Sequence, residues 1–426
     1  MDRIAQYLQT DPPSLASALA RFCQLARAHL GAWELSADKL SIETCISRLR
    51  DNQVPTSLEL LESPRAWLKA IDQELYETSA PGAWRADTAV FDGDEQHWII
   101  RRTSSGSGFN TRLGALGHYL TNHHVVPAHV GGTPTKAVSV PQATATACKS
   151  ALEHGAFKIA VVRFDDYVKE TLACFDAVHH FRMTGVDRPD SRLASILGAL
   201  NAARDANVDC IVFPELTTTP EIARRIAEHL LDEAIENSRR LPPLIVLGSY
   251  HEPTQGPDQP HTRNRAILLA HDGAQLMHFD KRRKVLFKFE PDGPDWGEAL
   301  SPCDTPYQLL PLEIGLLGLA ICKDLFDGPI SELLRAIDLD WLLVPSMSNK
   351  LNQHQTKTKQ LHNQSGTVSV IANQIMPGSN GDGDYPFGYI QQGADPQPCP
   401  NPIEIVDIPL RTEEMAAGRN HLRLVR

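Results

Sequence analysis

Three segments in the second half of the chain each end in a side chain that can take part in catalysis. They read Phe213-Pro214-Glu215, Phe279-Asp280-Lys281 and Ile321-Cys322-Lys323-Asp324, and each follows an apolar, strand-like run. They offer a carboxylate, an ammonium and a thiol. Because the carboxyl ends of strands in one sheet lie side by side, we expect Glu215, Lys281 and Cys322 to converge on one pocket.

The thiol of Cys322 is the candidate nucleophile. It follows the apolar run 315–321 and precedes a helical pattern, a position near a helix amino terminus that is expected to lower the thiol pKa below its usual value of about 8.5. Glu215 is the candidate base for the thiol proton. Lys281 and a backbone N–H near Lys323 would stabilise the charge that develops during attack on an amide or nitrile carbon. Asp324 is expected to line the pocket or to begin the helix.

Alternating strand and helix patterns position these residues. Helical periodicity is present after Asp190, from 221 to 238 and from 330 to 337. Buried-type strands are expected over 157–164, 208–213, 244–249, 265–270, 275–279, 316–322, 341–344 and 368–372. This alternation predicts an α/β domain over residues 156–426.

The first 150 residues have a different sequence pattern. Residues 1–80 carry amphipathic helical patterns over 14–30 and 67–75, and we expect an N-terminal helical module there. Residues 81–150 contain short β-like runs at 97–100 and 119–121, which predict a small β-rich or irregular segment. Its Thr-, Ala- and Pro-rich stretch 131–146 is predicted to be a linker.

Composition restricts the class of protein. The net charge of −11 argues against general binding to nucleic acid or to an anionic membrane surface. No apolar run approaches the roughly 20 residues that span a bilayer. The eight cysteines are scattered without a C-x-x-C pair, and no signal-peptide pattern is present, so we expect a cytoplasmic protein without disulfides or a metal site.

The three motifs, in this order, resemble those of the nitrilase (carbon–nitrogen hydrolase) superfamily. Asn264 with Asp272-Gly273, Val344-Pro345-Ser346 and Ala372-Asn373 resemble further strand ends of that family. The resemblance covers roughly residues 156–426. It implies a four-layer αββα sandwich, here with the N-terminal helical module and the small β-rich segment added. It also implies Glu215 as base, Lys281 as the cation that stabilises the oxyanion, Cys322 as nucleophile, and no cofactor.

Two assignments within the resemblance stay open. The family often has a second glutamate after the lysine, for which Glu290 is the best match and Glu298 the fallback. The sequence after Lys281 departs from the family pattern, so Lys284 is an alternative for the catalytic lysine, although the spacing from Gly273 favours Lys281.

The residues after the cysteine bear on the substrate. Nitrile-cleaving members commonly continue with Trp-Glu, whereas Lys323-Asp324 resembles amidase-type members. We therefore expect hydrolysis of a small-molecule amide rather than a nitrile, with release of ammonia or an amine. The family also implies a homodimer or a larger homo-oligomer. An alternative is a catalytically weak nitrilase fold that senses a ligand in a bacterial conflict system, an expectation based on the unusual sequence around Lys281 and on the added N-terminal region.

A second motif points to a different chemistry. Gly106-Ser107-Gly108-Phe109, followed by Thr121-Asn122-His123-His124, resembles the opening of a trypsin-like serine protease, in which His124 would be the catalytic histidine. A working triad also needs an aspartate and a serine with an oxyanion hole. The sequence lacks a Gly-Asp-Ser-Gly-type segment, so the expectation is a structural or degenerate remnant.

Overall fold

A computed structural model of the protein describes most of the chain. The described residues are 12–34, 38–51, 53, 55–78, 89–92, 95–101, 120, 122–164, 170–175, 178–236, 241–254, 261–287, 293–375 and 387–410.

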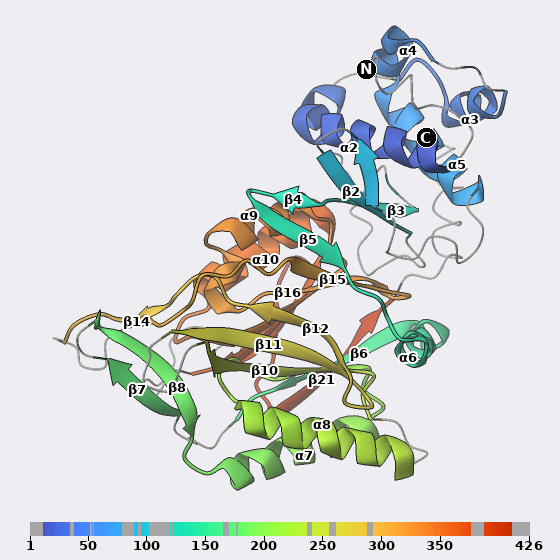
Figure 1. Ribbon diagram of the computed structural model, residues 1–426. Coiled ribbons are helices and arrows are strands. Elements are labelled where there is room, and N and C mark those ends of the chain that lie inside the picture. Colours follow the sequence, from blue (N-terminus) through green and yellow to red (C-terminus); the bar gives the residue numbers. More distant parts are fainter. Residues whose placement is uncertain are drawn as a thin grey trace.

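Two large mixed sheets form the centre of the molecule (Figure 1). The first has, in spatial order, β12 (Gln275–Asp280), β11 (Thr262–Ala270), β10 (Leu244–Pro253), β9 (Cys210–Val212), β6 (Ala156–Val162) and β21 (Ile403–Pro409). The second has β20 (Gln397–Pro398), β19 (Gly388–Gln391), β18 (Val368–Gln374), β17 (Trp341–Met347), β16 (Gly315–Leu319), β15 (Tyr307–Leu312), β5 (Thr133–Ala137) and β4 (His129–Val130).

The sheets pack face to face, and helices cover both outer faces. Side chains of both sheets, such as Val212 and Val344, share one buried core, and β9 and β10 lie against β17. Helices α7 (Pro189–Asp205) and α8 (Pro220–Glu236) pack on the outer face of the first sheet. Helices α9 (Pro329–Ala336) and α10 (Asn352–Ser365) lie on the side of the second sheet. The predicted four-layer αββα sandwich is therefore confirmed.

A smaller sheet lies beside the sandwich. It contains β13 (Leu286–Phe287), β14 (Trp296–Glu298), β8 (His180–Val186) and β7 (Glu170–Phe175), in that order, and β8 contacts β10. Strand β14 pairs in parallel with β8, which brings Glu298 next to Phe181 and towards the first large sheet. This sheet was not predicted from the sequence, because its strands lack a strict alternation of apolar and polar residues.

Four helices form the N-terminal part that the structure describes. They are α2 (Pro12–Glu34), α3 (Ile42–Arg50), α4 (Ser57–Glu62) and α5 (Pro64–Thr78), and they share a separate buried core. An antiparallel sheet follows, with strands β1 (Ala89–Asp92), β2 (Glu95–Arg101) and β3 (His123–Pro127). The helical and β-rich character of these regions is as predicted, whereas the exact division of the chain into three domains stays a prediction.

The predicted linker over 131–146 is wrong. This stretch contains β5 and the beginning of helix α6 (Gln142–His154). Strand β5 pairs in parallel with β15 and so belongs to the second large sheet. The alternation of β5 is hard to detect because two of its three buried residues are the polar, β-branched Thr133 and Thr135, whose hydroxyls have hydrogen-bond partners.

No helix in the described part of the chain is long and apolar enough to cross a bilayer.

Candidate active site

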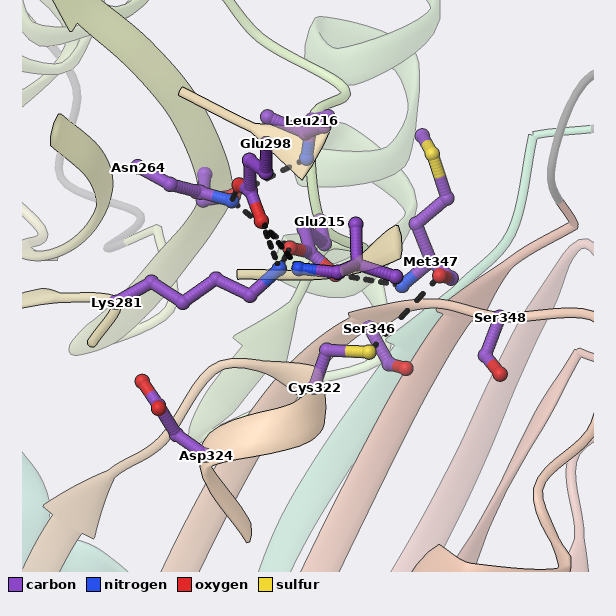
Figure 2. A network of polar contacts seen from close by, with 12 residues as sticks. Glu215, Leu216, Asn264, Lys281, Glu298, Cys322, Asp324, Ser346, Met347 and Ser348 are labelled. Carbon is purple, nitrogen blue, oxygen red and sulfur yellow. Dashed lines mark hydrogen bonds and ion pairs between the residues drawn. The ribbon is translucent and has the colours of Figure 1, made fainter. Parts of the chain in front are cut away.

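Glu215 lies three residues beyond the carboxyl end of β9 and is almost completely buried. Its Oε1 accepts hydrogen bonds from Asn264 Nδ2 at 2.8 Å and from Lys281 Nζ at 2.7 Å. Its Oε2 accepts the backbone N–H of Met347, at the end of β17, at 2.9 Å. The carboxylate therefore joins the two sheets at the edge where their parallel strands end (Figure 2).

A glycine in the neighbouring strand makes this arrangement possible. Gly248 in β10 has φ +74°, and a Cβ at this position would lie 2.0 Å from the carbonyl oxygen of Pro214. Only glycine combines this conformation with so close an approach. The chain can thus bring Glu215 to the sheet edge with β10 packed directly against it.

Lys281 follows the last residue of β12 and is buried. Its ammonium donates to Glu215 Oε1 and to Glu298 Oε2, both at 2.7 Å. Burial alone would lower the pKa of Lys281, but the charges of Glu215 and Glu298 outweigh it and hold the pKa well above its usual value. Lys284 is exposed, so the structure brings Lys281 and not Lys284 to the other site residues.

Glu298 completes the buried charge cluster. Besides Lys281, it accepts hydrogen bonds from Asn264 Nδ2 at 2.6 Å and His251 Nε2 at 2.9 Å. His251 Nδ1 accepts the backbone N–H of Met183, so Nε2 carries the ring hydrogen and donates to Glu298. Burial would raise the pKa of Glu298, but Lys281 and His251 lower it well below the usual range. The sequence analysis had Glu298 as the fallback to Glu290, which lies outside the described residues.

Cys322 opens the short helix η3 (Cys322–Leu325) just after β16, and its backbone adopts φ +44°. Its Sγ lies 3.9 Å from the carbonyl oxygen of Met347. Figure 2 shows the side chains of Glu215, Lys281 and Cys322 in one cluster, with the Lys281 ammonium directed at Glu215 and the Cys322 sulfur directed at Met347. The structure thus brings together the three residues that the sequence analysis singled out.

The expected lowering of the thiol pKa is wrong for the substrate-free protein. Burial raises the pKa of Cys322 to about 12, and the negative charge of Glu215 adds to this effect. Lys281 acts in the opposite direction, as does the Ser346 side chain. A helix of four residues has too small a dipole to outweigh burial. The resting group is therefore a thiol that needs a base.

Lys323 and Asp324 have supporting positions. The Lys323 side chain is one-third exposed and points towards Asp327, with Nζ 3.7 Å from Oδ2, so only its backbone lies beside Cys322. Asp324 is buried, and its Oδ2 accepts the backbone N–H of Arg282 at 2.8 Å. This contact fixes the chain just after Lys281. Burial raises the pKa of Asp324 to about 7.

Three polar neighbours of the site were not assigned a role from the sequence. Asn264 appeared there only as part of a hairpin pattern, and it bridges the two glutamates. His251 had no signal because it lies 47 residues along the chain from Glu298, and His354 had none because it lies in a helix that begins after the strand of Ser346 ends. Among the described residues, no cluster of His, Cys, Asp and Glu side chains has the arrangement of a metal site.

The histidines of the protease-like motif lie elsewhere. His123 and His124 point to opposite sides of β3, as neighbouring residues of a strand do. His123 Nδ1 contacts Asp72 of α5 at 2.9 Å, and His124 Nε2 contacts Asp340, just before β17, at 3.0 Å. The Gly- and Ser-containing part of the motif, 106–109, lies outside the described residues.

Comparisons with known proteins identify the domain that carries the site. Residues 183–376 match the family model of the carbon–nitrogen hydrolases, so the chain contains a carbon–nitrogen hydrolase domain, as the resemblance predicted. This segment contains Glu215, Lys281, Glu298 and Cys322. No curated protein sequence matches the chain.

Solved structures with a related shape include forms of the amidase from Nesterenkonia sp. AN1. One carries the acetamide moiety of fluoroacetamide covalently attached to its active-site cysteine; it is 17% identical, covers 60% of this chain and 91% of that chain, and has a TM-score of 0.40. A structure of an amidase from Nesterenkonia sp. is 19% identical with the same coverage and TM-score. A further variant of the AN1 amidase, described as a member of the nitrilase superfamily, is 18% identical, covers 63% and 96%, and has a TM-score of 0.37.

Proposed function

We propose that the carbon–nitrogen hydrolase domain of this chain cleaves the amide bond of a small molecule through a thioester on Cys322, with Glu215 as base and Lys281 as oxyanion-stabilising cation. One observation carries the proposal. A buried lysine is held 2.7 Å from a buried glutamate, and both charges act directly on the neighbouring thiol. A thiol, a base and a fixed cation in one buried cluster are the groups that acyl transfer needs.

The first half of the reaction forms the thioester. Glu215 takes the thiol proton as Cys322 Sγ bonds to the amide carbon, and the carbonyl electrons move onto the oxygen. Lys281 has three ammonium hydrogens, of which two bind Glu215 and Glu298; the third has no acceptor among the described residues and is available to this oxygen. The intermediate collapses, the C–N bond breaks, and Glu215 returns the proton to the departing amine.

The second half releases the acid. A water molecule attacks the thioester carbon while Glu215 takes one of its protons. The carbon–sulfur bond then breaks, the thiolate leaves, and the proton on Glu215 passes to the sulfur. The products are a carboxylic acid and a regenerated thiol, so the cycle balances without any other reagent.

The role of Glu298 in this scheme is to hold Lys281. Two buried carboxylates on one ammonium keep it charged and fix its position before substrate arrives, which is the preorganisation that makes such a cation effective. The backbone N–H of Lys323 is a second donor for the oxyanion, because the first N–H groups of a helix have no partner within it. The Lys323-Asp324 pair after the cysteine supports an amide substrate over a nitrile.

The test is a screen of small aliphatic amides with wild-type protein and Cys322→Ala, measuring released ammonia. We expect turnover by the wild type and at least a 10⁴-fold loss in the variant, about the scale seen when a catalytic nucleophile is removed. Intact-mass measurement during turnover of a slow substrate should show an acyl adduct on the Cys322 peptide. Cys174→Ala, which removes an exposed thiol, is the matched control and should keep full activity.

The other outcomes are informative. Full turnover by Cys322→Ala would contradict the proposal. Binding of amides without turnover or adduct by the wild type would instead favour the ligand-sensor alternative. Inhibition by a serine-directed fluorophosphonate, with Cys322→Ala still active, would favour the protease alternative.

A further inference from the structure

A serine and a histidine that the mechanism does not yet use lie next to the nucleophile. Ser346, near the end of β17, is fully buried, and its side chain lies beside the Cys322 sulfur (Figure 2). Its backbone carbonyl accepts the N–H of Glu215 at 3.3 Å, which fixes Ser346 relative to the base as well. The Ser346 side chain acts to lower the pKa of the Cys322 thiol, which favours the thiolate.

His354 lies in the first turn of α10 and contacts this serine. The ring is buried, its Nε2 is 3.2 Å from Ser346 Oγ, and the ring of Phe326 packs edge-on against it with the centroids 4.9 Å apart. Burial, together with the charge of Lys281, lowers the pKa of His354 to about 3. The ring is therefore neutral at physiological pH, and it cannot serve as a second base.

A neutral ring has one N–H, and its position decides where the serine hydrogen points. Nδ1 has no hydrogen-bond partner in the described part of the chain. If Nδ1 carried the hydrogen, a buried donor would be left without an acceptor, which is rarer in proteins than an unfilled acceptor. With the hydrogen on Nε2, the ring donates to Ser346 Oγ, and the serine hydrogen is free to point at the sulfur.

We propose that His354, through its Nε2–H, is a positioning residue that holds the Ser346 hydroxyl with its hydrogen directed at Cys322 Sγ. The inference deepens the proposed function and rests on Cys322 being the nucleophile. The directed hydroxyl stabilises negative charge on sulfur twice in the cycle: when Glu215 removes the thiol proton, and when the thiolate leaves the thioester. Glu215 and Lys281 are the charged groups that act on the sulfur, and the Ser346 hydroxyl would add an uncharged donor to them.

The test measures the thiol directly, without substrate. The rate of iodoacetamide alkylation of Cys322 is followed from pH 6 to 10 by mass spectrometry of the peptide that contains it. Ser346→Ala should slow alkylation about tenfold at a fixed pH and move the profile to higher pH, since a hydrogen bond to a charged group is lost. His354→Phe should have the same effect, and the double variant should be no worse than either single variant.

Conservative and control variants separate positioning from packing. His354→Gln places an N–H near the position of Nε2 and should keep the alkylation rate within about threefold of the wild type. His362→Phe, in the same helix, should leave the alkylation profile unchanged. For amide turnover, His354→Phe should lower kcat and leave KM unchanged.

Three results would overturn the inference. They are an alkylation rate of His354→Phe equal to that of the wild type, additive effects in the double variant, and an alkylation rate of His354→Gln as low as that of His354→Phe. These results are independent of the amide screen. A failed screen would remove the proposed function, whereas the alkylation profiles would still report whether the two side chains control the thiol.

Discussion

Buried, charged side chains lie beside both ends of strand β17, yet the two ends are built differently. At the amino end, Asp340 accepts the backbone N–H of Leu316 at 2.7 Å and lies 3.0 Å from His124. At the carboxyl end, Met347 donates its N–H to Glu215 and lies next to Cys322. Seven strand residues separate the ends by roughly 23 Å.

The difference lies in what the charges do. Asp340 joins the starts of neighbouring strands: its backbone N–H donates to Leu316, and its carbonyl accepts the N–H of Val368. At the other end, two carboxylates hold one ammonium beside a reactive atom. A buried pair that ties strands together supports stability, whereas a buried cluster around a nucleophile supports chemistry. Ligand sites in α/β sheets form at the carboxyl ends of strands, where side chains from neighbouring strands meet.

The largest effect that would test this contrast is expected at Lys281. Lys281→Met should lower kcat by about 10²–10³-fold or more, since it removes a donor to the oxyanion. It should also lower the free energy of unfolding by about 3–5 kcal/mol, because Glu215 and Glu298 remain buried without their cation. Kinetics on variant protein with a confirmed folded fraction would separate the two effects.

Lys284→Met is the matched control, since Lys284 is exposed. It should change kcat by less than about twofold, as surface substitutions usually do. The reverse result, with Lys284→Met inactive and Lys281→Met active, would show that the register of the two lysines has been assigned incorrectly.

The second effect is expected at the opposite end of β17. Asp340→Asn should lower the free energy of unfolding by about 1–3 kcal/mol, because the charged acceptor of His124 and Leu316 is lost. The kcat of the folded fraction should stay within about twofold of the wild type. Asp338→Asn, in the same loop, is the control for urea unfolding. A tenfold loss of kcat in Asp340→Asn would contradict the view that the amino end of β17 serves stability and only the carboxyl end serves catalysis.

Acid should destabilise the protein through the charged residues at the carboxyl end of β17. The pKa of Glu298 is lowered in the folded protein, so the folded state binds fewer protons than the unfolded state in acid. The stability that this group contributes is fully present above its unfolded pKa of about 4.3 and is lost as the pH falls below it. Urea unfolding between pH 3 and 7 should show this slope.

Glu298→Gln should make that slope shallower and lower the stability at pH 7. An unchanged slope in the variant would mean that other carboxylates dominate the acid response. It would also mean that the Lys281–Glu298 pair adds little to the stability of the fold.

The smallest effect is expected at Lys323. Its side chain is partly exposed and lies 3.7 Å from Asp327, and only its backbone is assigned to the site. Lys323→Gln should therefore leave kcat and KM within about twofold of the wild type. A tenfold rise in KM alone would indicate that the Lys323 ammonium binds the substrate.

Much of the site could be predicted because it lies at strand ends. Each of Glu215, Lys281 and Cys322 follows a buried apolar strand, and strand periodicity is a local signal that one sequence carries. The order of the three motifs then suggested the fold. The linker over 131–146 was predicted wrongly because two of the three buried residues of β5, Thr133 and Thr135, are polar, so hydropathy gave little sign of burial.

The sequence by itself determined the reactive groups and the strands that end in them. Only the tertiary structure decided that Lys281 contacts Glu215 and that Glu298 contacts the same lysine. It also placed Ser346 beside the Cys322 sulfur and His354 against Ser346. The tertiary structure also decided the direction of the Cys322 pKa shift. The position near a helix amino terminus was expected to lower this pKa, whereas burial raises it. The physical reason is that contacts between residues far apart in the chain, and the burial that they create, depend on how the two sheets pack. No local pattern encodes that packing.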